Sequence, residues 1–115
     1  MLKKPFRLTK EKDFKAVYLK GKSFFSNELS IKFSRNNLIY SRFGIVVSHR
    51  VASKATKRNR IKRQLREIIR NNLMKIKRGL DVVIITKKPI LTIKFNEKRE
   101  LLEQVLKKMN IIDHD

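Results

Sequence analysis

The stretch KATKRNRIKRQLREIIR, residues 54–70, carries eight Lys or Arg side chains and a single carboxylate, that of Glu67. A charge run of this kind is usually a solvated face or a flexible tail. Here, however, apolar residues recur inside the run at helical spacing: Ile61, Leu65, Ile68 and Ile69. At 100° per residue they fall, with Ile76, in an arc of about 100°, which is the expected core-facing side of a helix. The pattern therefore predicts a folded helix.

The cations of this stretch lie outside the apolar arc. The adjoining sector contains Lys62, Arg63, Arg66, Arg70 and Lys77, and the remaining flank contains Arg60, Gln64, Glu67 and Asn71. Carboxylates that could offset the repulsion at i,i+3 or i,i+4 spacing are nearly absent. Arg outnumbers Lys five to one between residues 58 and 70, and the guanidinium group matches phosphate bidentately. A phosphate-binding surface is favoured over a solvated face. It is also favoured over a membrane-surface helix, which would need Trp or Phe at its apolar edge.

The whole chain has the same charge imbalance. Its 115 residues include 30 Lys plus Arg and 10 Asp plus Glu, a formal net charge of +20. Self-repulsion of this size opposes compaction unless a polyanion neutralises it, so nucleic acid is the leading expected partner and an anionic membrane the second. An apolar fraction of 41% predicts a folded protein. No linker or repeat divides the sequence, and we expect one domain over residues 1–115.

The composition also excludes several classes of protein. The chain has no Cys, which rules out disulfides, Cys-ligated zinc and thiol nucleophiles. No apolar run is long enough for a signal peptide or a membrane span. We therefore expect a cytoplasmic protein that does not bind membranes.

Alternating hydrophobicity predicts strands on both sides of the basic helix. Residues 28–34 (ELSIKFS) and 42–48 (RFGIVVS) alternate as half-buried strands do, and residues 38–41 are a candidate for a further short strand. Residues 81–86 (DVVIIT) are a β-branched apolar run, which is typical of a buried central strand. The second face of residues 42–48 carries only Gly44, Val46 and Ser48. Small residues there leave room for something to lie against the strand.

Two further helices are predicted towards the ends of the chain. Thr9 is the candidate N-cap of a helix that reaches about Lys20, and Gly21 ends it. A last helix begins at about Asn96 and carries apolar residues at core spacing: Leu101, Leu102, Val105, Leu106 and Met109.

The basic helix links the predicted strands into one fold. Ser53 and Thr56 are its candidate N-caps, and it is expected to run to about Lys77, before Arg78-Gly79. A helix of this length allows the strands on either side of it to pair in parallel. The order of elements predicts an α+β protein, an α/β sandwich with three helices on a small mixed sheet and one sheet face partly open.

At these residues the sequence resembles a known family. RNRIKRQLRE, residues 58–67, resembles the signature of the bacterial ribonuclease P protein subunit, which partners the catalytic RNA that removes 5′ leaders from precursor tRNA. FRLTKEKDFKAVYLKGKSF (residues 6–24) is similar to the family's first helix and turn, and RFGIVVSHRVASKATKRNRIKR (residues 42–63) to its third strand and signature helix. DVVIITKKP (residues 81–89) is similar to its fourth strand and exit.

The resemblance implies a fold and a function. The fold would be an α/β sandwich with an unusual left-handed βαβ crossover, which the general preference for right-handed crossovers would not predict. The function would be that of an accessory subunit in an endoribonuclease for tRNA 5′ maturation. The RNA subunit would carry out catalysis and Mg²⁺ would act through that RNA, with no metal site in the protein. The implied partners are the catalytic RNA and precursor tRNA, with no obligate protein partner.

The resemblance also assigns roles to residues. The basic helix would contact the catalytic RNA through Arg58, Asn59, Arg60, Lys62, Arg63, Arg66 and Arg70. A cleft between the first helix and the open sheet face would hold the single-stranded leader through Phe14, Tyr18, Lys32, Ser48, His49 and Arg50. The chain departs from the family at His49-Arg50, where Lys-Lys is common, and near Lys32, where an aromatic is common. Because Phe14 and Tyr18 have i,i+4 spacing, packing in the core and stacking on RNA both remain open.

The sequence does not predict a catalytic centre in the protein itself. The carboxylates are few and scattered, and the two histidines, His49 and His114, are far apart in the chain. Neither a triad spacing nor a Gly-rich phosphate loop is present. Two alternatives to a ribonuclease P subunit remain, a general RNA-binding module of ribosomal-protein type and a nuclease that acts without RNA. Only the nuclease would cleave precursor tRNA alone.

Overall fold

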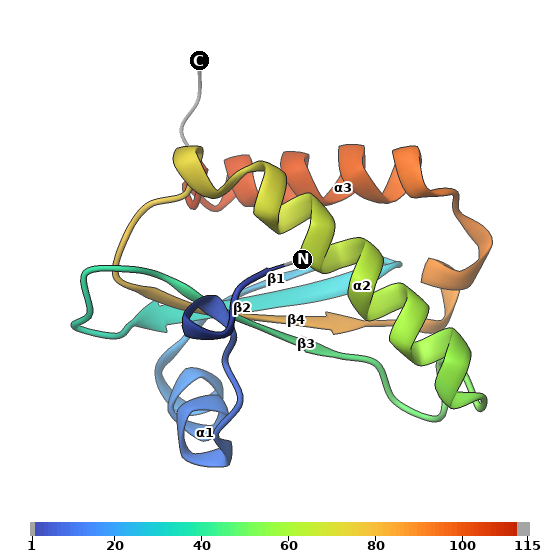
Figure 1. The fold of residues 1–115 in the computed structure, drawn as a ribbon, viewed down its shortest axis with the longest axis horizontal. Coiled ribbons are helices and arrows are strands. Elements are labelled where there is room, and N and C mark those ends of the chain that lie inside the picture. The colour runs from blue at the N-terminus through green and yellow to red at the C-terminus, as the bar shows by residue number, and fades with distance from the viewer. Residues whose placement is uncertain (1, 113–115) are drawn as a thin grey trace.

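A computed structural model describes residues 2–112 of the chain, and His114 lies outside the described residues. Within that range one mixed sheet has four strands, β1 (Lys22–Phe25), β2 (Leu29–Arg35), β3 (Arg42–Val46) and β4 (Leu80–Thr86). The α-helices in the same range are α1 (Glu11–Lys20), α2 (Ala55–Asn71) and α3 (Phe95–Lys108). Figure 1 shows α2 and α3 on one face of the sheet and α1 on the other. The α+β sandwich predicted from the sequence is confirmed.

The sheet has the strand order β1-β2-β4-β3. β2 pairs antiparallel with both β1 and β4, whereas β3 pairs in parallel with β4. The parallel pair is joined through α2, as expected for a connection that must return to the same end of the sheet. The handedness of this crossover stays a prediction.

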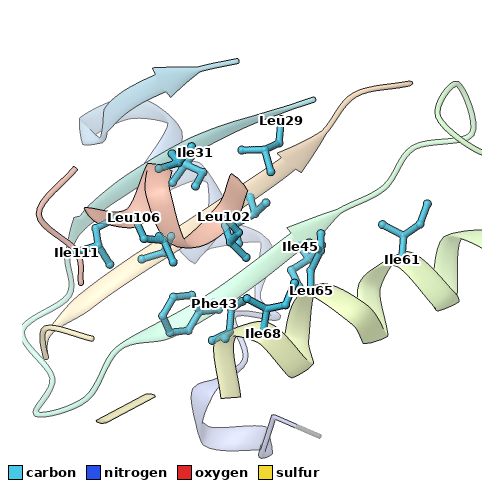
Figure 2. Close-up of a cluster of buried hydrophobic side chains, with 14 of the residues drawn as sticks. Leu29, Ile31, Phe43, Ile45, Ile61, Leu65, Ile68, Leu102, Leu106 and Ile111 are labelled. Atoms are coloured by element: carbon cyan, nitrogen blue, oxygen red, sulfur yellow. The ribbon is translucent and has the colours of Figure 1, made fainter. Parts of the chain in front are cut away.

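The main core lies between the sheet and the pair α2 and α3. Alternate residues of the strands point into it, among them Ile31, Phe43 and Ile84. Figure 2 shows side chains of α2 and α3 meeting those of the strands, with Ile61, Leu65, Ile68, Leu102 and Leu106 among those labelled. Full burial of one such side chain contributes about 1.5–3 kcal/mol. The apolar arc predicted for the basic helix is confirmed, because Ile61, Leu65, Ile68 and Ile69 are all buried.

A smaller cluster attaches α1 to the opposite face of the sheet. Leu8, Val17 and Val83 are buried there, and Phe14, Val46 and Ile85 pack against them half-buried. An ion-pair network anchors the same helix, because Arg42 contacts Asp81 on β4 at 2.7 Å and Asp13 on α1 at 3.3 Å. The hydrogen bond to Asp81 raises the pKa of Arg42. Because Val46 and Ile85 on this face stay half-buried, α1 covers only part of it.

The N-caps predicted for two of the helices are wrong. α1 begins at Glu11 after Lys10, and no side chain caps it, so Thr9 has no capping role. α2 begins at Ala55 after Lys54, again without a side-chain cap. Ser53 lies one residue too early, and Thr56 already belongs to the first helical turn, where its hydroxyl cannot act as an N-cap.

α2 also ends earlier than predicted, at Asn71. The side chain of Asn72 donates a hydrogen bond to the carbonyl of Ile68 at 2.8 Å and a second one to Glu103 on α3. A short 3₁₀ turn, Leu73–Lys75, follows. Ile76 is buried as predicted, but it lies outside the helix and forms a β-bridge with Ile112. Competition from the Asn side chain for the helix carbonyls explains the early end.

The strands differ from the prediction at the sheet edge. β1 was not predicted, since four residues are too few to display a period. The candidate strand at residues 38–41 is wrong, because these residues form a loop that follows Asn37 at φ 63°. β3 ends at Val46, so Val47 and Ser48 belong to the connection to α2. No helix among residues 2–112 is long and apolar enough to cross a membrane.

Candidate nucleic-acid interface

The outer side of α2 carries the predicted RNA-contacting residues. Asn59, Arg60, Arg63 and Arg70 are exposed, and Lys62 and Arg66 are half-buried. Their side chains extend from a helix whose other side is fixed in the core, so the backbone that carries these residues has a defined position. We call this set, Asn59, Arg60, Lys62, Arg63, Arg66 and Arg70, the α2 surface.

Arg58 differs from the other cations of the helix because its guanidinium is already bound. Its Nη1 donates to the carbonyls of Ala52 at 3.0 Å and Ser53 at 2.8 Å, and it lies 3.3 Å from Nδ1 of His49. These contacts fix the turn that precedes α2. Arg58 is thus a positioning residue for the turn, which its place in the RNR triplet does not reveal.

Arg7 joins the α2 surface from the start of the chain. Its Nε donates to the carbonyl of Leu2 at 2.8 Å. Burial lowers the pKa of Arg66, and the positive charge of Arg7 lowers it further. The two guanidinium groups are therefore close enough to repel each other. No carboxylate contributes to that shift. Arg7 was missed by sequence reasoning because only the path of the folded chain brings it next to α2.

On its other flank α2 faces α3 across a groove of about 470 Å³. Arg60 and Gln64 line it from α2, and Phe95 and Lys98 line it from α3. Lys98 is 6% exposed and donates to Oε1 of Gln64 at 3.0 Å. Burial and the nearby charge of Arg60 lower the pKa of Lys98. The groove extends the cationic region from α2 towards α3.

Arg70 at the end of α2 is partly neutralised. It contacts Glu67 at 2.6 Å across one turn of the helix. The hydrogen bond from Arg70 lowers the pKa of Glu67, and the same bond raises the pKa of Arg70. Of the cations on this surface, Arg70 therefore offers the least uncompensated charge to an anion.

On the opposite side of the sheet, α1 and the open sheet face bring together three of the predicted leader-binding residues. The rings of Phe14 and Tyr18 have centroids 6.5 Å apart. Nζ of Lys32 lies 5.6 Å from the centroid of the Tyr18 ring, a cation–π arrangement. Tyr18 is 41% exposed. We call this group, Phe14, Tyr18 and Lys32, the α1 cleft.

Phe14 occupies the space that Gly44 leaves on β3. A Cβ added to Gly44 would lie 2.5 Å from Cζ of Phe14 and 3.3 Å from Cβ of Leu8. The room predicted on this strand face is therefore filled by the protein's own Phe14 ring at that position. Phe14 packs and Tyr18 is exposed, so the two aromatics have different surroundings despite their shared spacing.

The remaining predicted residues, Ser48, His49 and Arg50, are exposed in the turn between β3 and α2. The carbonyl of Ser48 accepts hydrogen bonds from the backbone N–H groups of Val51 and Ala52. Through His49, this turn contacts Arg58 of α2. It therefore connects the end of β3 to the α2 surface, and the structure does not gather it into the group formed by Phe14, Tyr18 and Lys32.

Comparison with known proteins gives a consistent result. The family model described as Ribonuclease P matches residues 2–110. The chain is 41% identical to the ribonuclease P protein component of Synechocystis sp., with 98% of this chain and 92% of the relative covered. It is 40% identical to that of Fusobacterium nucleatum, with 91% and 97% covered.

Solved structures agree with the sequence comparison. The RNase P protein of Staphylococcus aureus superposes with a TM-score of 0.87 at 28% identity, covering 94% of this chain and 98% of that one. The RNase P protein of Thermotoga maritima superposes with a TM-score of 0.80 at 38% identity, covering 89% and 96%.

Proposed function

Since this chain belongs to the ribonuclease P protein family and is the protein subunit of that endoribonuclease, we propose that its two cationic surfaces divide the binding of RNA between them. The α2 surface binds the catalytic RNA, and the α1 cleft binds the single-stranded 5′ leader of precursor tRNA. The observation that carries this proposal is their placement on opposite sides of one sheet, with several cations on the α2 surface and Lys32 in the α1 cleft. The subunit acts in the cytoplasm, where it assists tRNA processing.

The α2 surface suits a structured RNA. Asn59, Arg60, Lys62, Arg63 and Arg66 extend from a helix that the core holds rigid, so little backbone freedom is lost on binding. Arg forks match phosphate oxygens in pairs. Arg58 supports this contact indirectly, by holding the turn at the start of the helix. Binding should release counterions and depend strongly on salt.

The α1 cleft suits a single strand. Tyr18 presents a ring with a cation beside it, and stacking one base on such a ring contributes about 1–3 kcal/mol. Phe14 packs over Gly44 and lies beside the Tyr18 ring. Ser48, His49 and Arg50 offer polar contacts in the turn that leads to α2. The mature tRNA product lacks the leader. Contacts to the leader therefore raise the affinity for substrate over product.

The chemical step belongs to the RNA in this proposal. Among residues 2–112, no three His, Asp or Glu side chains gather in a way that could hold a metal ion. Mg²⁺ bound by the RNA would supply the charge that stabilises the reacting phosphate. What this chain contributes is neutralisation of phosphate repulsion and alignment of the leader.

Replacement of Tyr18 tests the leader assignment. In the holoenzyme, Tyr18→Ala should weaken binding of precursor tRNA by about 5- to 150-fold, the equivalent of one lost stacking contact, and leave binding of mature tRNA unchanged. Tyr18→Phe keeps the ring and serves as the control, with near-normal binding of both. Equal losses for precursor and mature tRNA would refute the leader assignment.

A further inference from the structure

An exposed aromatic residue stands at the end of the edge strand β1. Phe25 is 66% exposed, whereas its neighbour Phe24 packs against the main core. Consecutive residues of a strand point to opposite faces, so Phe25 points to the face that α1 only partly covers. Burial of this ring adds little to the fold, since most of it contacts solvent.

The register of the sheet places Phe25 close to the α1 cleft. Phe25 is paired with Ser30, and Ser30 with Ile85. Paired residues share a face, so this row lies on the same face as Lys32, two residues farther along β2. The offset along the strand is about 7 Å. Ser30, Lys32 and Ser34 are the β2 residues on this face, so an aromatic here comes from β1 or from α1.

A cation accompanies Phe25, as one accompanies Tyr18. Nζ of Lys87 lies 5.7 Å from the centroid of the Phe25 ring. The same ammonium group donates to the carbonyl of Ser26 at 2.6 Å, and the backbone N–H of Lys87 donates to the carbonyl of Glu28. These bonds fix Lys87 against the turn between β1 and β2. The cation beside the Phe25 ring is thus held in place before any ligand binds.

We propose that Phe25 and Lys87 form a second base-stacking site for the leader, directly beside the site formed by Tyr18 and Lys32. The proposal rests on the leader-binding function proposed above. An aromatic ring with an adjacent ammonium group can stack a base and pair with its phosphate. The two pairs lie about one row of the sheet apart, a separation that a single extended strand can bridge.

Charge favours a nucleic acid over a second copy of the chain as the occupant of this face. The chain has a formal net charge of +20, so a second copy would bring further cations to Lys32 and Lys87. A single-stranded RNA brings phosphates to both lysines and bases to both rings. Dimer formation through the β1 edge is the competing explanation, and sedimentation of the protein detects it.

The test measures affinity of the reconstituted holoenzyme for precursor tRNAs with leaders of increasing length. Phe25→Ala should bind mature tRNA like the wild type and bind precursors about 5- to 150-fold more weakly once the leader is long enough to reach the second site. Phe25→Leu keeps the apolar character and should lose affinity similarly, whereas Phe25→Trp should retain it. Lys87→Gln should reduce the salt slope of leader binding by about 0.7, one single-strand phosphate contact.

Comparison with Tyr18→Ala separates this proposal from the one it rests on. The losses for Tyr18→Ala and Phe25→Ala should begin at leader lengths that differ by one or a few nucleotides. Met74→Ala, which removes a fully exposed apolar side chain from the turn after α2, is the matched control and should behave as wild type. Thermal unfolding of each variant checks that the fold is intact.

Three outcomes would overturn the second site. A Phe25→Ala holoenzyme with wild-type affinity at every leader length overturns it and leaves the proposed leader function standing if Tyr18→Ala still shows its loss. Equal weakening for precursor and mature tRNA overturns it as well. A change in the sedimentation of the protein with unchanged leader affinity would assign Phe25 to self-association instead. If neither variant shows a leader-dependent loss, the proposed leader function itself fails.

Discussion

Arg58 and Arg60, which lie on either side of Asn59, have different surroundings. Arg58 binds two backbone carbonyls and contacts His49, whereas Arg60 is exposed and lines the groove towards α3. The sequence could predict the cationic character of both. It could not predict this division, because the carbonyls that Arg58 binds belong to a turn whose path is set by the strand before it.

Arg58→Lys should therefore affect stability, unlike a similar change at Arg63. Nη1 of Arg58 serves both carbonyls, and the ammonium group of a Lys side chain ends one bond short of that position, so we expect a loss of about 1–2 kcal/mol in the free energy of unfolding. Urea denaturation measures it. Arg63→Lys, on the exposed side of α2, is the matched control and should cost less than about 0.5 kcal/mol. Equal effects of the two changes would contradict the positioning role.

Gly44 is a second residue whose role depends on a close approach. The Phe14 ring lies where a Cβ would extend, so Gly44→Ala forces the ring or the strand to move. Overpacking of this kind typically costs about 1–3 kcal/mol. Denaturation of Gly44→Ala, Phe14→Leu and the double variant should show that the smaller side chain at position 14 recovers part of the loss. Additive effects would mean that the two residues do not share the space as described.

At the scale of elements, the buried side of α2 could be predicted from the sequence, but the residue at which the helix ends could not. The apolar arc defines the buried side because four residues recur at helical spacing. The end of the helix depends on the Asn72 side chain, which binds the carbonyl of Ile68. The sequence did not predict β1 for a different reason. Its four residues adopt a strand conformation because they pair with β2, and this tertiary interaction leaves no recognisable pattern in so short a segment.

The α2 surface should contribute a measurable share of the salt dependence of RNA binding. Replacing Arg60 and Arg63 with Gln removes two exposed cations, and the slope of log affinity for the catalytic RNA against log salt should fall by about one to two phosphate contacts. Filter binding at several salt concentrations measures the slope. Replacing Lys75 and Lys108, exposed cations outside α2, removes the same charge and should leave the slope near the wild-type value. Equal slopes for both double variants would mean that overall charge, and not the α2 surface, determines binding.

At the scale of the whole molecule, the sheet separates the two proposed binding surfaces while the turn of residues 48–52 connects them. Arg58 and His49 meet in that turn, so the end of β3 and the start of α2 are held together. The sandwich was predictable because the helices, β2 and β3 display their periods and β4 is a β-branched apolar run. The strand order β1-β2-β4-β3 was not, since it depends on which edges pair, and the positions of Arg7 and Phe25 follow from that order and from the chain path. Sequence periodicity thus predicted the layers, and tertiary pairing decided which residues share a face.

The central claim is that this chain assists an RNA catalyst by binding RNA. The most direct test is the rate of leader removal from precursor tRNA by the matching catalytic RNA at low Mg²⁺, measured with and without the protein. The protein should accelerate cleavage, because +20 of formal charge offsets the phosphate repulsion that Mg²⁺ otherwise screens, and the protein alone should cleave nothing. An unchanged rate on adding the protein, or cleavage by the protein without RNA, would contradict the account.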